Sequence, residues 1–232
     1  MRFFKKKNRD EEQSRIIVAE GASSKVAGVE GYNRLKDNLL YINADGNHKV
    51  IQIESASAKE GKTTVACNLA VSLGLTDKKV CIIDLDFRRP RVHRVFEISK
   101  DEGLAEYFLG DLSKEQIIKK SDYKNVDIIT RGAEIYNSSL VLVSDKFKDL
   151  IAYLREQYDY VIVDCPPVLH VSDYIHISKV TDGVIFLIAY GITTKSQVAE
   201  AIKELKNNNA KILGTVISMY NRKDGGYNYY YW

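Results

Sequence analysis

The stretch VIQIESASAKEGKTT, residues 50–64, decides the fold expected for this chain. Its first part, Val50–Ser55, is rich in β-branched residues and predicts a short strand. Its last part ends in Gly-Lys-Thr, and the apolar residues that follow predict a helix from about Lys62 to Gly74. A strand, such a loop and a helix place backbone N–H groups and a helix N-terminus around phosphate oxygens. The sequence therefore predicts a nucleotide site here, although Ala56 replaces the first glycine of the pattern G-x-x-x-x-G-K-[ST].

The residues at the end of this loop have separate expected roles. Gly61 lets the backbone approach the ligand closely, and the ammonium group of Lys62 reaches the β- and γ-phosphates. Thr63 offers its hydroxyl to Mg²⁺, and the hydroxyl of Thr64 can bond the α-phosphate. The alternative is an ordinary turn between a strand and a helix, in which Gly-Lys-Thr occurs by chance.

Two further apolar runs end in aspartate. CIIDLDFRRP, residues 81–90, carries Asp84 and Asp86 two positions apart, so both side chains project to the same side of an extended chain. VIVDCPP, residues 161–167, ends in Asp164 and has the Walker B pattern, which can hold a water molecule of the Mg²⁺ shell. Because ligands of open α/β sheets bind at the carboxyl ends of strands, we expect these aspartates to face the Gly-Lys-Thr loop. The alternative for each aspartate is a helix cap or a turn residue.

Apolar runs alternate with amphipathic stretches along most of the chain. Runs that are apolar throughout are typical of parallel strands covered on both faces, and the alternation means crossover connections. The expected fold class is α/β, of the P-loop NTPase type, with a doubly wound, mainly parallel sheet flanked by helices. Strands are predicted at residues 50–55, 79–86, 126–130, 160–164, 183–189 and 211–218, and helices at about 26–44, 62–74, 144–158, 172–179 and 195–208.

The composition is that of a folded domain. Hydrophobic residues make up 45% and charged residues 28% of the 232 residues, which excludes disorder over the whole length. The net charge of only +3 does not indicate a nucleic-acid partner. No apolar run has the length of a transmembrane helix or of a signal peptide. Cys67, Cys81 and Cys165 lie in apolar segments, so we expect buried thiols and a reducing, cytoplasmic setting.

The two ends of the chain differ from the domain between them, which is expected to cover residues 26–222. Residues 1–25 begin with a basic cluster and are expected to be a flexible leader, either solvated or weakly attached to an anionic membrane surface. Residues 223–232 carry two glycines and then tyrosines, and this tail is expected to be mobile.

The set EGKTT, IIDLDFRRP and VIVDCPP, followed by the tyrosine cluster, resembles the bacterial tyrosine kinases of the capsular and exopolysaccharide family. The similarity covers about residues 26–232. It implies a short ATP:protein-tyrosine phosphotransferase on a P-loop scaffold that regulates polysaccharide synthesis and export. It also implies a position at the inner face of the cell membrane, through a separate transmembrane chain-length regulator that activates the kinase. A cognate tyrosine phosphatase is a further implied partner.

The resemblance implies ATP and Mg²⁺ as cofactors and gives the aspartates their roles. We expect Asp84 to accept the phenolic proton, and Asp86 and Asp164 to hold the metal with Thr63, largely through its waters. An exchange of roles between Asp84 and Asp86 stays open. With Lys62, these aspartates form the expected catalytic set. The phosphate-binding loop is expected to comprise Ser57, Ala58, Lys59, Glu60, Gly61, Lys62, Thr63 and Thr64.

The expected phosphate acceptors lie in the tail, and we expect transfer between neighbouring molecules. The alternative is an aromatic tail that docks on its own domain or on a partner. Arg88 and Arg89 are expected to help hold ATP or to receive an acidic tail, or else to be surface residues. The acceptors are Tyr227, Tyr229, Tyr230 and Tyr231, and the histidines without metal-ligand spacing, expected to be ordinary polar residues, are His48, His93, His170 and His176.

The chain departs from the family's pattern in three places. Ala58 and Lys59 stand where the loop usually has proline and glycine. Asn33 and Lys36 stand at the arginine positions of a Glu-x-x-Arg-x-x-Arg helix, so the sequence does not support ring assembly by that helix. Ser218 stands where related ATPases often have an asparagine near adenine.

Two other functions compete with the kinase. Partition or septum-positioning ATPases of the same P-loop branch usually carry an extra lysine about where Ser57 sits, and its absence favours the kinase. An ATP-binding adaptor with weak kinase activity is the second alternative, because the loop is altered at Ala58 and Lys59. A dinucleotide-binding oxidoreductase is disfavoured because no G-x-G-x-x-G follows the first strand.

Overall fold

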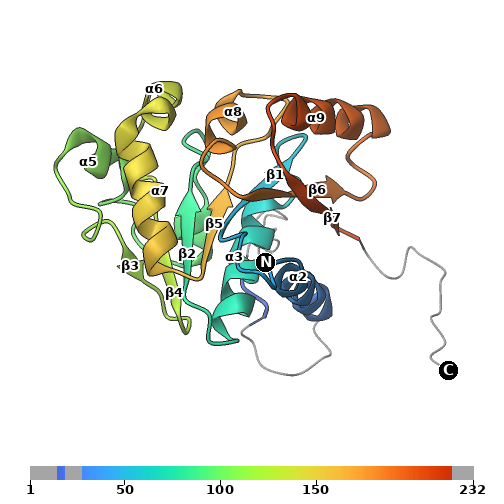
Figure 1. Ribbon diagram of the computed structural model, residues 1–232, viewed down its shortest axis with the longest axis horizontal. Helices are drawn as coiled ribbons and strands as arrows, with labels where there is room; N and C mark the ends of the chain where they lie inside the picture. The colour runs from blue at the N-terminus through green and yellow to red at the C-terminus, as the bar shows by residue number, and fades with distance from the viewer. Residues whose placement is uncertain (1–14, 19–27, 221–232) are drawn as a thin grey trace, which may run out of the picture.

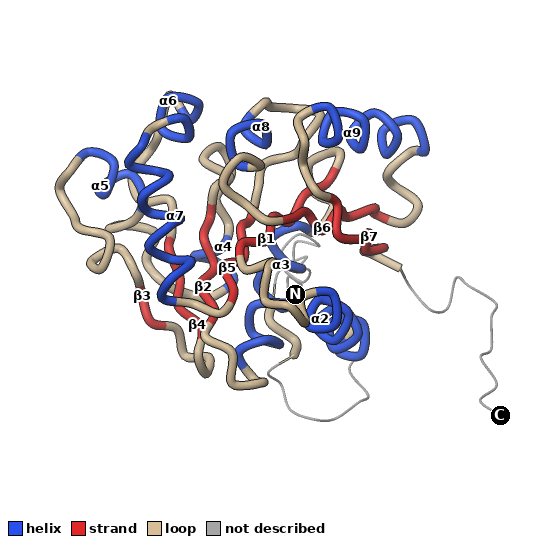
Figure 2. Tube along the Cα trace, viewed as in Figure 1, coloured by secondary structure: helices blue, strands red, loops and turns tan. Residues whose placement is uncertain are grey.

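The computed structural model describes residues 15–18 and 28–220, and a seven-stranded sheet runs through the middle of the protein (Figures 1 and 2). Its strands are β1 (Val50–Ser55), β2 (Val80–Asp84), β3 (Lys119–Lys120), β4 (Val126–Ile129), β5 (Tyr160–Asp164), β6 (Gly183–Ala189) and β7 (Ile212–Ser218). Their order across the sheet is β3-β4-β2-β5-β1-β6-β7. All neighbours are parallel except β3 and β4. The mainly parallel α/β fold predicted from the sequence is therefore confirmed.

Helices cover both faces of this sheet (Figure 1). The helices are α2 (Val29–Ile42), α3 (Lys62–Gly74), α4 (Val92–Val95), α5 (Leu104–Leu109), α6 (Ser138–Val143), α7 (Asp145–Gln157), α8 (Asp173–Ile177) and α9 (Lys195–Asn207). The first three share one core with the sheet, and the others pack on the opposite face. The sequence did not predict β3, α4, α5 or α6, because elements this short lack a full period of the apolar pattern.

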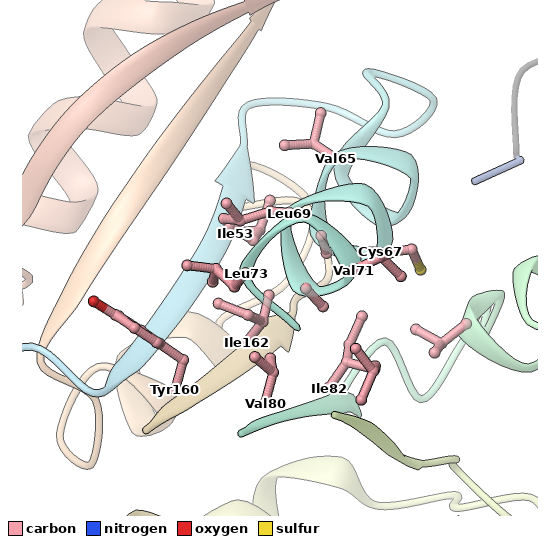
Figure 3. Close-up of a cluster of buried hydrophobic side chains, with 14 of the residues drawn as sticks. Ile53, Val65, Cys67, Leu69, Val71, Leu73, Val80, Ile82, Tyr160 and Ile162 are labelled. Carbon is pink, nitrogen blue, oxygen red and sulfur yellow. The ribbon is translucent and has the colours of Figure 1, made fainter. Parts of the chain in front are cut away.

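The helix that follows the Gly-Lys-Thr loop is anchored to the centre of the sheet. Figure 3 shows Leu69 and Leu73 of α3 packed toward Ile53 of β1 and Ile162 of β5, and all four side chains are fully buried. Burial of each such side chain stabilises the fold by about 1.5–3 kcal/mol. The N-terminus of α3 is thereby held at the edge of the sheet where the parallel strands end.

Part of the expected leader is packed. Ile16 and Val18 are buried in the core that α3 shares with the sheet, so residues 15–18 do not behave as a solvated leader. The rest of the leader, and the whole tail at residues 223–232, lie outside the described residues.

Two expectations about compartment can be compared with the structure. All three cysteines are free and buried, as the sequence predicts. Among the helices of the described ranges, none is long and apolar enough to cross a membrane.

Candidate active site

A cavity of about 780 Å³ lies where the parallel strands end. Its floor is the loop between β1 and α3, and its walls come from the segments that follow β2, β5 and β7, from α2, and from Ile17. Asp84 of β2 pairs in register with Asp164 of β5. On its other side, Asp164 pairs with Ile53 of the neighbouring strand β1. The three sequence motifs therefore meet at one edge of the sheet, as predicted.

The loop before α3 has the shape that a phosphate-binding loop requires. Gly61 caps α3 with φ +94°, a left-handed conformation that glycine adopts without strain. Lys59 has φ +64°, in the same region, and this is where the family's pattern has glycine. A residue with a Cβ pays roughly 1–2 kcal/mol for this conformation. The departure at Lys59 therefore keeps the shape of the loop at a small cost in stability.

Ser57 and Glu60 were expected to bind phosphate, but in the structure they stabilise the shape of the loop. Ser57 and Glu60 do not line the cavity, whereas the other loop residues from Ala58 to Thr64 do. The buried carboxylate of Glu60 accepts hydrogen bonds from the Ser57 N–H at 2.9 Å and from the Thr193 hydroxyl at 2.6 Å. The Ser218 hydroxyl donates to the Glu60 carbonyl at 2.7 Å. The loop is thus tied to the segments after β6 and at the end of β7, and no motif marked Thr193.

The ammonium group of Lys62 lies in the wall of the cavity and is largely buried. It donates to the Ser55 hydroxyl at 2.9 Å and to the Ser57 carbonyl at 3.3 Å. These are its acceptors among the described residues, so one of its three N–H bonds remains for a ligand.

Thr63 and Asp164 come into direct contact in this site. The Thr63 hydroxyl donates to Asp164 Oδ2 at 2.6 Å, and the buried Oδ1 has no partner among the described residues. Burial raises the pKa of Asp164 to about 7, and the hydrogen bond from Thr63 opposes this rise. A hydroxyl beside a carboxylate oxygen that lacks a partner fits a hydrated divalent cation, which takes oxygen ligands.

The two aspartates after β2 are separated by the fold. Asp84 is fully buried, and its Oδ2 accepts the N–H groups of Arg91 and Val92, each at 3.0 Å. Burial, with the nearby charge of Asp164 as a second cause, raises the pKa of Asp84. Asp86 is only partly buried and lines the cavity, while Asp84 does not. The cap and turn role considered as an alternative therefore describes Asp84. Asp86 also accepts the N–H group of Arg89 at 2.9 Å, but of the two aspartates it alone lines the ligand space.

The wall beyond Asp86 is basic. Arg88, Arg89, Arg91 and His170 line it, so His170 belongs to the site even though the sequence did not single it out. Arg88 pairs with the buried carboxylate of Asp173 at 2.7 Å. No hydrogen bond or ion pair of the Arg89 or Arg91 guanidinium occurs among the described residues, which leaves both groups for an anionic ligand.

Glu54 is a residue of this region that sequence reasoning missed. It is fully buried at the end of β1, and neither carboxylate oxygen has a partner in the described part of the chain. Burial raises the pKa of Glu54 to about 8, and the nearby charge of Lys62 opposes the rise. The available signal was an acidic residue inside a strand with a fully buried pattern of β-branched residues. Burial therefore favours the protonated, neutral form of Glu54 beneath the phosphate-binding loop.

Changing Glu54 to glutamine is expected to stabilise the protein at about pH 8 and to have little effect near pH 4. The unfolded chain loses this proton near the ordinary pKa of 4.5, and the folded protein near 8. The stability that depends on the proton is therefore complete below pH 4.5 and lost as pH rises to 8. Glutamine mimics the protonated form and removes this loss, which is on the order of a few kcal/mol.

Urea unfolding of both proteins between about pH 4 and pH 9 measures this difference. Glu156→Gln, at an exposed position of α7, is the matched control and should follow the wild type. Parallel stability curves for Glu54→Gln and the wild type would contradict the assignment of a buried, protonated Glu54.

Comparison with known proteins identifies the family. The family model described as "AAA domain" matches residues 48–215. The tyrosine-protein kinase YwqD of Bacillus subtilis is 35% identical over 213 residues, which cover 92% of this chain and 90% of YwqD. The crystal structure of the chimerical protein CapA2B2 superposes with a TM-score of 0.82 at 30% identity, over 87% of this chain and 88% of that one.

A second kind of relative has the same nucleotide-binding fold. The septum site-determining protein MinD of Pyrococcus horikoshii was solved with Mg-ADP. It superposes with a TM-score of 0.65 at 26% identity, over 75% of this chain and 71% of the MinD chain. This similarity is lower than that to YwqD and to CapA2B2. The chain belongs to the family of bacterial tyrosine-protein kinases, and it is a protein-tyrosine kinase on a nucleotide-binding P-loop fold.

Proposed function

We propose that the chain binds Mg·ATP in the cavity and transfers the γ-phosphoryl group to tyrosines of its own C-terminal cluster. The observation that carries this proposal is the hydrogen bond from Thr63 to Asp164, with the second oxygen of Asp164 left without a partner beside the Gly-Lys-Thr loop. Phosphoryl transfer depends mainly on positioning and on neutralising charge, and these groups supply both.

The phosphate chain lies along the loop and the first turn of α3. The N–H groups from Ala58 to Thr64 surround it, and the free N–H of Lys62 neutralises charge on the transferred group. The hydroxyl of Thr63 and the carboxylate of Asp164 would hold Mg²⁺ beside the loop. When bound, the metal neutralises the negative charge of the β- and γ-phosphates.

Asp86 is the better candidate to receive the phenolic proton. It lines the cavity, whereas Asp84 holds the N–H groups of Arg91 and Val92 and fixes the turn that carries Asp86. The ordinary pKa of a tyrosine is near 10, so a positioned carboxylate helps the hydroxyl to attack even though it is a weak base. Asp84 is thus a positioning residue in this proposal.

The acceptor enters from the basic wall. Arg89 and Arg91 offer guanidinium groups there, and the tail contributes Asp224 and, once transfer has begun, phosphotyrosines. In this proposal the tail comes from a neighbouring molecule, because the tail is short and in-line transfer restricts the geometry in which an acceptor can approach the site.

The names of two relatives support a proposal for the pathway, and the family resemblance supports one for the partners. A Klebsiella pneumoniae relative is named as a putative tyrosine-protein kinase in a cps region, and one from Staphylococcus aureus as CapB. We extend this context to the present chain, which then regulates capsular or exopolysaccharide synthesis and export. A transmembrane chain-length regulator holds it at the inner face of the membrane and activates it, and a cognate phosphatase reverses the modification.

Asp86→Asn and Asp164→Asn are each expected to lower Mg·ATP-dependent turnover by about 10²-fold or more, since both remove a charge that faces the ligand. Asp84→Asn is expected to lower turnover as well, but with a fall in thermal stability. The reason is that both carboxylate oxygens of Asp84 accept N–H groups, one from Asp86 at 3.2 Å and the other from Arg91 and Val92, whereas the asparagine amide has a single oxygen. Initial rates and melting temperatures of the three variants distinguish a loss of turnover alone from a loss of turnover together with stability. Full activity in all three variants would refute the site.

The proposal is tested by incubating the purified chain with Mg·ATP, with and without a peptide of the activator's cytoplasmic tail. Phosphotyrosine on the chain is the expected result. Release of inorganic phosphate without phosphotyrosine would identify a switch ATPase of the MinD type. Nucleotide binding with neither product, in the presence of the activator, would identify an adaptor.

A further inference from the structure

Residues 15–18 are hydrogen-bonded to α3, the helix that begins at the phosphate-binding loop. The side-chain oxygen of Asn68 accepts the N–H groups of Ile17 at 2.8 Å and of Val18 at 3.4 Å. Its amide group donates to the carbonyls of Arg15 and Thr64, each at 2.9 Å. Asn68 is fully buried in α3, so losing these bonds would leave buried polar groups unpaired.

These hydrogen bonds place Ile17 in the wall of the cavity. Its neighbours Ile16 and Val18 are buried in the core, while Ile17 is partly exposed and lines the ligand space. Its Cδ1 lies over Gly28 so closely that a Cβ at Gly28 would come within 3.0 Å of it. Gly28 begins α2, which packs beside α3 (Figure 1). Residues 15–18, α2 and α3 therefore contribute to the same wall.

The chemistry of the cavity shows which part of the nucleotide meets this wall. Asp86 and the arginines occupy the side formed by the segment after β2, where the transferred phosphoryl group and its acceptor must lie. Thr64, whose hydroxyl is expected to bond the α-phosphate, is joined through Asn68 to Ile17, and Val65 follows it in the chain. These two lining residues, with Gly28 and Tyr32 beside them in the lining, carry no charge. A nucleobase has flat apolar faces and carries no charge, so it matches this side and not the basic one.

We propose that Ile17 is a nucleotide-binding residue that covers the nucleoside, and that Asn68 is the positioning residue that holds it there. This rests on the proposed function in two respects: the ligand is a nucleoside phosphate, and its transferred phosphoryl group lies on the side of Asp86. Since Asn68 bonds both the leader and the carbonyl of Thr64, docking of residues 15–18 and binding of the nucleotide stabilise each other.

The test uses the full chain and a fluorescent ADP analogue with Mg²⁺. Ile17→Ala is expected to raise the dissociation constant by about fivefold, since it removes apolar surface from the wall. Asn68→Ala is expected to raise it at least as much, and Ile17→Val is expected to restore most of the affinity. Val71→Ala is the matched control, because Val71 is buried in α3 at the same core but does not line the cavity; it should lower the melting temperature and leave the affinity unchanged.

Hydrogen exchange gives a readout that does not depend on activity. Saturating ADP is expected to slow exchange of the Ile17 and Val18 N–H groups in the wild type, and this protection should disappear in Asn68→Ala. If Ile17→Ala binds the analogue as the wild type does and ADP leaves this exchange unchanged, the inference is wrong. If the wild type binds no nucleotide at all, the proposed function itself has failed.

Discussion

Lys62→Met is expected to abolish phosphorylation of the tail while the protein still folds. The ammonium group contacts the Ser55 hydroxyl and the Ser57 carbonyl and has one N–H left for the phosphates. Losing a preorganised cation that faces the developing charge costs about 10²–10³-fold in rate. Methionine has a similar length, so the change in folding stability is limited to the two hydrogen bonds, each worth about 1 kcal/mol.

Phosphotyrosine detection after incubation with Mg·ATP, together with a thermal melt, checks this expectation. Lys203→Met, at an exposed position of α9, is the control and should retain wild-type phosphorylation. Unchanged phosphotransfer in Lys62→Met would overturn the site, and loss of its cooperative melt would show that Lys62 serves the fold instead.

Replacement of the four tail tyrosines by phenylalanine is expected to remove most phosphotyrosine and to spare nucleotide binding. Phenylalanine keeps each ring and deletes only the acceptor oxygen, so a tail that merely docks through its rings would keep its function. Tyr136→Phe is the matched control, because this side chain is 90% exposed and lies outside the tail. Mass spectrometry of the phosphorylated chains measures the loss. The changed tyrosines are Tyr227, Tyr229, Tyr230 and Tyr231.

Mixing an inactive variant that keeps its tail with an active variant that lacks the tail tyrosines tests whether transfer occurs between molecules. Lys62→Met protein with an intact tail can only receive phosphate, and the four-phenylalanine protein can only donate it. We expect the Lys62→Met molecules to become phosphorylated at concentrations where the wild type does. If they acquire none, transfer between molecules is wrong, and the tail must reach the site of its own chain.

The motifs could be predicted from the sequence because the chemistry they perform is local. A loop that surrounds phosphate uses consecutive backbone N–H groups, so Gly61, Lys62 and Thr63 must be neighbours in the chain. Fully covered parallel strands are rich in apolar and β-branched residues, so β1, β5 and β6 were predicted with their observed bounds. Together these patterns determined the fold class and the edge of the sheet at which the site lies.

The difference between Asp84 and Asp86 could not be predicted in this way. Their spacing places both on one side only while the chain stays extended, and β2 ends at Asp84. Beyond that residue the chain turns, because the buried carboxylate of Asp84 captures the N–H groups of Arg91 and Val92. Which aspartate reaches the ligand was therefore decided by the path of the turn.

The sequence by itself determined the phosphate-binding loop, the Walker aspartates and the sheet that carries them, since each depends on residues close together in the chain. Only the tertiary structure decided what surrounds that loop. Thr193 braces Glu60 across 133 positions, and Asn68 holds Ile17 across 51. Contacts at such separations leave no periodic pattern in the sequence, because they form only when the core has packed the distant segments against each other.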